Sequence, residues 1–150
     1  MLHRGIMSGL LLLAGGAVAA AAPAPQTQTT AAGVYTAQQA DAGAALYAER
    51  CALCHGATAQ GTWEVPPLTG RFMGNWGHGS VGALADYIGR AMPQMAPGTL
   101  EPQEKIALVA YLLRANGMPA GSRALPADPA ALAAITIEPA VRQTGVQPAR

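Results

Sequence analysis

The sequence predicts an all-α protein in which three main helices surround a bound group. Apolar residues recur at helical intervals in residues 36–50, 81–92 and 102–116, and no strand pattern competes with them. Residues 51–80 show little regular pattern, and a loop that long is uncommon in a compact domain unless it wraps something. Only 5% of the 150 residues are aromatic, so few large side chains can fill a core. We therefore expect a bound group to fill part of it.

The N-terminus has the pattern of an export signal over residues 1–22. A weakly basic start with Arg4 precedes an apolar run, residues 6–18, and small residues that suit cleavage. The competing interpretation is an uncleaved membrane anchor, which needs about 20 strongly apolar residues, whereas Gly and Ala dilute this run. We expect cleavage, a flexible leader over residues 23–35, and a periplasmic or otherwise exported protein without stable membrane insertion.

The charge of the expected mature chain is balanced. Removing residues 1–22 takes away Arg4 alone, so eight of the nine Lys and Arg remain against eight Asp and Glu. Nucleic-acid binding requires a basic face that displaces counterions from phosphates. The composition therefore argues against a nucleic-acid partner.

The first predicted helix covers residues 36–50. Thr36 suits its start, and Gln39 follows at the spacing of a capping box. Four residues then recur on one face, namely Ala40, Gly43, Ala44 and Tyr47.

The second predicted helix covers residues 81–92, with Ser80 as its cap and Pro93 as its stop. Its apolar face consists of Val81, Leu84, Ala85 and Ile88.

The third predicted helix covers residues 102–116. Pro102 suits its first turn, Glu104 favours the positive end of its dipole, and Asn116 followed by Gly117 suits its end. Its apolar stripe consists of Ile106, Val109, Ala110 and Leu113.

A C-terminal extension, residues 122–150, follows the main helices. A short helix is expected to start at Asp128 and Pro129 and to carry Leu132 and Ile135. Beyond Glu138 we expect a frayed end, so the extension as a whole is predicted to be partly disordered.

The motif CALCHG, residues 51–56, contains Cys51, Cys54 and His55, and these are the two cysteines of the whole chain. A structural zinc site requires four Cys or His ligands, usually in two pairs that lie close in sequence. The sequence contains no second such pair of Cys or His residues. A thioredoxin-like redox pair needs a βαβ context, which a helical sequence lacks. Two thiols at this spacing can instead form thioethers to one porphyrin, and the next imidazole can bind its iron. Covalent haem c is the favoured interpretation.

With this motif the sequence resembles the class I c-type cytochromes over residues 36–121. The resemblance also covers Gly43 and Tyr47 before the motif and three further stretches, PPLTGRF (66–72), MPQMAPGTL (92–100) and ALVAYLLRANG (107–117). It implies the class I cytochrome c fold, with crossing terminal helices in which Gly43 and Tyr47 meet Tyr111. In two places the chain departs from the family: Glu101 replaces the usual Ser or Thr cap, and Lys105 is the one lysine, against a lysine-led docking mode.

The resemblance places the sixth iron ligand in MPQMAPGTL. Met92 ends the second helix, and Pro93 stops the helix there, which gives the side chain a fixed base. Met95 lies in mid-loop, and His78 in a glycine-rich loop is the alternative for a bis-histidine haem. We expect His55 and Met92 to ligate the iron.

The function implied is one-electron transfer in the cell envelope between a donor and an acceptor, such as a dehydrogenase and an oxidase or another cytochrome. We expect no enzymatic activity and no catalytic residues, because two protein ligands leave the iron no open position. Two alternatives remain: a haem enzyme or gas-binding protein with a displaceable sixth ligand, and a tightly bound electron-transfer subunit of a dehydrogenase complex.

Overall fold

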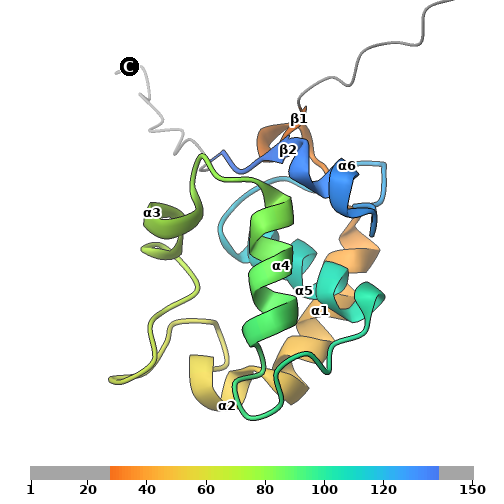
Figure 1. Cartoon of the computed structure of the whole chain (residues 1–150). Helices are drawn as coiled ribbons and strands as arrows, with labels where there is room; N and C mark the ends of the chain where they lie inside the picture. Colours follow the sequence, from red (N-terminus) through yellow and green to blue (C-terminus); the bar gives the residue numbers. More distant parts are fainter. Residues whose placement is uncertain (1–27, 139–150) are drawn as a thin grey trace, which may run out of the picture.

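The structure is a computed structural model in which residues 28–138 are described (Figure 1). Three longer helices, α1, α4 and α5, build its body, and short elements complete it. In chain order the elements are β1 (Gln28–Thr29), η1 (Thr30–Ala32), α1 (Ala37–Arg50), α2 (Ala52–His55), α3 (Phe72–Trp76), α4 (Val81–Ala91), α5 (Pro102–Ala115), α6 (Pro129–Ala133) and β2 (Ile135–Thr136). The predicted all-α architecture with three main helices is confirmed.

Helix α1 begins as its sequence predicts. The backbone N–H of Gln39 donates to Thr36 Oγ1 at 3.3 Å, and the N–H of Thr36 donates to Gln39 Oε1 at 3.2 Å. This reciprocal pair satisfies two donors that the first helical turn leaves free.

Helices α1 and α5 cross in close contact. A Cβ atom added to Gly43 would lie 1.9 Å from the carbonyl oxygen of Ala107, so a glycine is required at this point. One turn later the rings of Tyr47 and Tyr111 pack with their centroids 4.7 Å apart. The predicted contact of Gly43 and Tyr47 with Tyr111 is confirmed.

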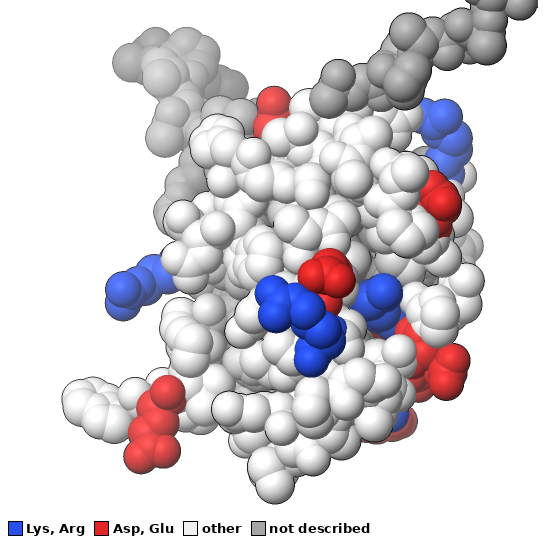
Figure 2. All heavy atoms as spheres, in the orientation of Figure 1, with Lys and Arg blue, Asp and Glu red and all other residues white. Residues whose placement is uncertain are grey.

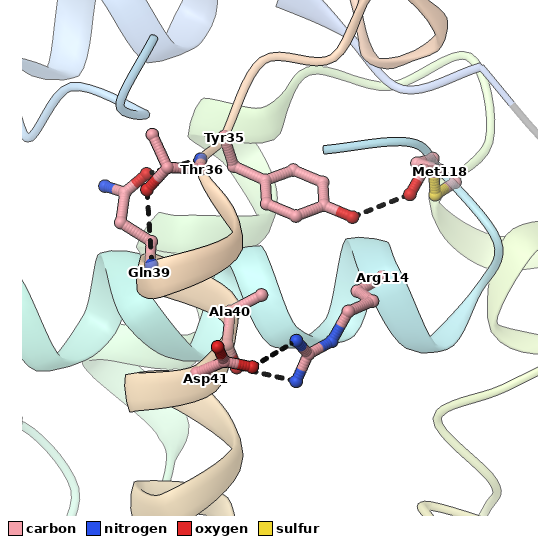
Figure 3. A network of polar contacts seen from close by, with 7 residues as sticks. All are labelled: Tyr35, Thr36, Gln39, Ala40, Asp41, Arg114 and Met118. Carbon is pink, nitrogen blue, oxygen red and sulfur yellow. Dashed lines mark hydrogen bonds and ion pairs between the residues drawn. The ribbon is translucent and has the colours of Figure 1, made fainter. Parts of the chain in front are cut away.

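Polar contacts from Arg114 also join these two helices (Figure 3). Its guanidinium donates to Asp41 Oδ1 at 2.6 Å and to the carbonyl oxygen of Ala40 at 3.0 Å. Close by, Tyr35 donates its hydroxyl to the carbonyl oxygen of Met118 at 2.6 Å (Figure 3). The start of α1 and the end of α5 are thus fixed to each other.

The starts of α4 and α5 are capped in different ways. Ser80 Oγ accepts from the N–H of Ala83 at 3.0 Å, which confirms the predicted cap of α4. At α5, Glu101 stands at the cap position, and its own N–H donates to Glu104 Oε2 at 2.9 Å. Glu104 therefore supports the start of a helix that lacks the family's usual Ser or Thr.

The long segment between α1 and α4 contains more structure than predicted. It holds α2 and α3, and α3 is bound to the body through aromatic contacts. The ring of Trp76 lies 6.3 Å from that of Phe72 and 5.5 Å from that of Tyr87 in α4. Helices this short cannot be predicted from apolar periodicity, because four or five residues are too few to show a helical repeat.

The structure also contains one short strand pair, which no strand pattern in the sequence indicated. Strands β1 and β2 pair in parallel, with Gln28 opposite Ile135 and Thr29 opposite Thr136. The expected position of Ile135 on the short helix was wrong, because α6 ends at Ala133 and Ile135 belongs to β2. Two-residue strands carry no alternation that a sequence can display.

The segments on either side of residues 36–121 join the same core. Val34 and Tyr35 are buried, as are four residues after position 121, namely Leu125, Leu132, Ile135 and Ile137. Gln39 also exchanges two hydrogen bonds with the backbone of Leu125, at 2.9 and 2.8 Å. Residues 28–35 and 122–138 are thus packed parts of the domain. The domain therefore extends beyond the expected range, residues 36–121, at both ends.

Other expectations concern residues outside the described range. These are the export signal over residues 1–22, the first part of the leader, and the frayed end beyond Glu138. Within residues 28–138 no helix has the length and apolar character needed to cross a membrane.

Candidate functional site

Cys51, Cys54 and His55 lie together on one helical turn. Cys51 caps the end of α1, where its N–H donates to the carbonyl oxygen of Tyr47 at 2.9 Å, and its own carbonyl oxygen starts the next turn. It accepts from the N–H of Cys54 at 3.1 Å and from that of His55 at 3.0 Å. Both thiols are free, with Cys51 half-buried and Cys54 exposed. The predicted trio is therefore presented by α2 and by Cys51, the residue that directly precedes it.

The His55 ring is oriented by a backbone atom of the following loop. Its Nδ1 lies 3.4 Å from the carbonyl oxygen of Pro66, a long contact that only an N–H can make favourable. A proton on Nδ1 leaves the lone pair of Nε2 free for a metal, as second-shell carbonyls commonly arrange. The N–H of Gly61 donates to the His55 carbonyl oxygen at 2.8 Å and fixes the same loop.

The turn that carries the motif is anchored to the core by Tyr47. Its hydroxyl donates to the carbonyl oxygen of Gly56 at 2.7 Å. Burial, with smaller contributions from Tyr111 and Cys51, raises the pKa of Tyr47 to about 12, so the hydroxyl remains a donor at physiological pH. Gly56 has a positive φ of 79°, which lets the chain reverse there.

The Cys51 thiol is not activated as a redox nucleophile would be. Burial raises its pKa, and the neighbouring charge of Arg50 opposes this only in part. Catalytic cysteines in disulfide oxidoreductases instead have lowered pKa values. This environment argues against a redox disulfide.

The two candidate methionines lie in different environments. Met92 is the residue at the end of α4, and its N–H donates to the carbonyl oxygen of Ile88 at 3.0 Å. Its side chain is half-buried and packs against the core. Met95 is 93% exposed. In Figure 1 the end of α4 that carries Met92 points toward the same end of the molecule as α2. Met92 is thus partly buried at the end of the molecule that holds α2, whereas the side chain of Met95 is exposed.

His78 stands at the other end of α4. Eleven helical residues separate it from Met92, which corresponds to about 16 Å along the axis. Its side chain is exposed, and its N–H donates to the carbonyl oxygen of Ile137 at 2.7 Å. This position gives no support to a bis-histidine site.

These residues match the requirements of a covalently bound porphyrin. Two free thiols on one turn suit thioether bonds, and an imidazole with a free Nε2 suits axial ligation. Several partly buried apolar side chains adjoin the core and offer walls for a flat apolar group, namely Leu68, Met73, Trp76, Met92 and Leu100. Within residues 28–138 no three His, Cys, Asp or Glu side chains gather as a cation site would require.

Two contributors to the site were not identified from the sequence. One is the Pro66 carbonyl, because a backbone acceptor has no residue-type signature and only the Pro66-Pro67 pair marked this loop as stiff. The other is Arg50, whose side chain reaches the loop after Met92. A basic residue at the end of a helix is too common to signal such a role.

The chain is similar to a family of c-type cytochromes and to two dehydrogenases. A family model described as cytochrome c oxidase, cbb3-type, subunit III matches residues 38–112. Thiosulfate dehydrogenase of Stutzerimonas stutzeri (strain A1501) is 35% identical over 77 residues, which cover 47% of this chain and 25% of that protein. The crystal structure of the sulfane dehydrogenase SoxCD from Paracoccus pantotrophus shares 28% identity at a TM-score of 0.44, over 60% of this chain and 54% of that one. The chain thus spans a quarter of the curated relative and about half of the structural one.

Proposed function

Because the chain belongs to the c-type cytochrome family described as cytochrome c oxidase, cbb3-type, subunit III, we propose that it carries single electrons between redox proteins outside the cytoplasm. Class I cytochrome c is its fold, haem c its cofactor and electron transfer its chemistry. The observation that carries the finer assignment is the α2 turn, where two free thiols stand beside an imidazole whose Nδ1 faces a carbonyl oxygen.

Each site residue has a separate task in this proposal. Cys51 and Cys54 would hold the haem through thioether bonds, and His55 would offer Nε2 to the iron. Met92 offers its thioether sulfur as the second ligand from the half-buried end of α4. When bound, the haem supplies a one-electron iron couple, whose potential is raised by a Met ligand.

The protein frame keeps these groups in place. Tyr47 and the Pro66 carbonyl fix the turn and the ring, and the α1–α5 crossing fixes the end of α1. Pre-set ligands need little rearrangement when an electron arrives or leaves. With both axial positions filled by the chain, the centre is proposed to be a carrier without enzymatic activity of its own.

A second candidate is a tightly bound electron-transfer subunit of a dehydrogenase that acts on sulfur compounds. The 35% identity with thiosulfate dehydrogenase favours it. The two candidates differ in what purifies with the protein under native conditions: a free carrier elutes alone, whereas a subunit elutes with its catalytic partner.

The location outside the cytoplasm is supported by the signal-like pattern of residues 1–22, where apolar and small residues follow Arg4. N-terminal sequencing of the protein from its native host tests it. A mature start after residue 19 or 22 is expected, and an intact Met1 contradicts export with cleavage.

The ligand assignment is tested with Met92→Ala and Met95→Ala in the ferric protein. We expect the near-infrared iron–sulfur charge-transfer band to vanish in Met92→Ala, because the sulfur is removed, and to survive in Met95→Ala. The reverse result assigns Met95. Ready binding of carbon monoxide to the reduced wild type instead supports the gas-binding alternative.

A further inference from the structure

Arg50 connects the end of α1 to the loop that follows Met92. Its Nη2 donates to Thr99 Oγ1 at 3.1 Å. The hydroxyl of Thr99 in turn donates to the carbonyl oxygen of Ala96 at 2.8 Å. A hydroxyl can accept one hydrogen bond while it donates another, so the two contacts form one continuous chain. Arg50 thereby reaches the middle of the loop from the helix that precedes Cys51.

The same guanidinium also faces the start of α5. Arg50 Nη1 lies 4.0 Å from Glu104 Oε1, and Glu104 Oε2 accepts the N–H of Glu101 at 2.9 Å. Both side chains of this pair are 34% exposed, which places them at the edge of the packed region. The Arg50 side chain therefore lies between the loop that follows Met92 and the start of α5, the next helix in the chain.

The loop has few other attachments. The N–H of Ala96 donates to the carbonyl oxygen of Pro93 at 2.9 Å, which closes a turn within the loop itself. Among the hydrogen bonds of the described residues, the one from Arg50 is the only one that joins residues 93–99 to another part of the chain. Residues 94–99 are all exposed, so apolar burial contributes little to keeping them in place.

We propose that Arg50 is a positioning residue that holds residues 93–99 against the end of α1 and so keeps Met92 at its ligand position. This inference rests on the assignment of Met92 under the proposed function. Without the Arg50–Thr99 contact, the loop detaches more often, and Met92 yields its position more readily to a competing ligand. Local opening of this kind is governed by the few contacts that close the segment.

The experiment uses the ferric holoprotein and imidazole, a small ligand that competes with a methionine sulfur. Arg50→Ala and Thr99→Val each remove one partner of the contact, and Thr99→Val leaves the residue next to Cys51 untouched. We expect imidazole to bind about twofold to tenfold more tightly in each variant, the size of effect that one exposed hydrogen bond supports. The double variant is expected to fall short of the sum of the two single effects, because the Arg50–Thr99 contact is counted in both, while the contacts of Arg50 with Glu104 and of Thr99 with Ala96 are lost separately.

Arg90→Ala is the matched control. Arg90 stands two residues before Met92, but its side chain binds Asp86 within α4 at 3.0 Å, and none of the hydrogen bonds or ion pairs of the described residues joins it to residues 93–99. Arg90→Ala removes one positive charge near the site, as Arg50→Ala does. Its imidazole affinity is expected to equal that of the wild type. Wild-type affinity in both Arg50→Ala and Thr99→Val, or an equal rise in Arg90→Ala, overturns the proposal.

Hydrogen exchange of the peptide that contains residues 93–99 separates this inference from the ligand assignment. Faster exchange in Arg50→Ala and Thr99→Val, with unchanged exchange in α4, supports the role of Arg50 even if Met92→Ala retains its iron–sulfur band. Unchanged exchange in the loop overturns that role even if Met92 proves to be the ligand.

Discussion

At the scale of single residues, the His55 ring depends on a backbone oxygen for its orientation. No substitution of Pro66 removes its carbonyl, whereas a change in the path of the loop moves it away from Nδ1. The N–H of Gly61, whose φ is 76°, binds the His55 carbonyl and holds that loop close. The path of the backbone around Gly61 and Pro66 thus favours the His55 tautomer that carries its proton on Nδ1.

The thioether assignment predicts that haem becomes extractable only when both cysteines are replaced. Acid–acetone should extract no haem from the wild type, and none from Cys51→Ser or Cys54→Ser molecules that retain one thioether. The double variant should release all of it, because no covalent bond remains. Absorbance of the extracted and the retained fractions measures this. Release of haem from the wild type contradicts the assignment.

Tyr35 predicts a loss of stability at alkaline pH. Burial raises its pKa above 10, while the nearby charge of Arg114 lowers it in part, and its hydroxyl donates to Met118. Its folded-state pKa is higher than its unfolded one, so its contribution is complete below about pH 10 and decreases as pH rises further.

Urea unfolding of wild type and Tyr35→Phe between pH 7 and 11 tests this prediction. At pH 7 the variant should lose about 1 kcal/mol of unfolding free energy, the value of one buried hydrogen bond, and part of the alkaline loss should disappear. An equally steep decline in both proteins would assign the alkaline loss to other groups.

At the scale of elements, the α1–α5 crossing makes a sharp prediction for Gly43→Ala. The new Cβ would meet the backbone of Ala107, which cannot rotate away, so the helices must separate. We expect a loss of about 1–3 kcal/mol in unfolding free energy, even though alanine favours a helix over glycine by about 1 kcal/mol.

Gly89→Ala in α4 is the matched control for that substitution. Its Cβ would meet the side chain of Lys105, whose flexible end can move. This variant should be neutral or slightly more stable, since only the helix preference changes. Equal destabilisation of both variants in denaturant melts would show that the Gly43 contact is not the cause.

The main helices could be predicted because their signals are local. Thr36 with Gln39, Ser80, Pro93 and Pro102 mark helix ends through contacts with their own neighbours. The β1–β2 pair could not be predicted, because its partners Gln28 and Ile135 are far apart in the sequence. Each strand is also only two residues long, which is too short to show a pattern. Helix α3 depends on Tyr87 in α4 in the same way, through Trp76.

For the candidate site, the sequence alone suggested Cys51, Cys54 and His55 as haem-binding residues and Met92 as the second iron ligand, and these assignments stay predictions. The motif itself carries that information, and Pro93 marks the end of α4 next to Met92. Contacts made through backbone atoms or over long separations were not predictable, as for Pro66 with His55 and Arg50 with Thr99. Both require the folded path of a loop.

At the scale of the whole molecule, charge is sparse and dispersed. The face shown in Figure 2 is mostly uncharged, with a few acidic and basic side chains scattered over it, some of them side by side. Large exposed apolar residues occur in the motif and in the loop after Met92, where Leu53 is 95% and Met95 is 93% exposed. We predict that redox partners dock here, on apolar residues that include the small residues Ala52, Pro93 and Ala96.

This surface predicts electron transfer that depends little on salt. At 0.1 M salt the screening length is about 10 Å, which weakens only those encounters that rely on charge. The bimolecular rate with the physiological partner, measured by stopped flow, should change by less than about tenfold between low and moderate salt, given so few charges to screen. A larger fall would reveal a charged docking site on one of the two proteins.

The parallel pairing of β1 with β2 has a consequence for joining this domain to others. Both described ends of the chain leave from one pole, and α2 lies at the opposite pole (Figure 1). A fluorescent reporter or a second redox module joined directly before residue 28 or directly after residue 138 would therefore start from the pole opposite the thiols and the imidazole. Such a fusion is predicted to leave the pole that holds α2 open to solution.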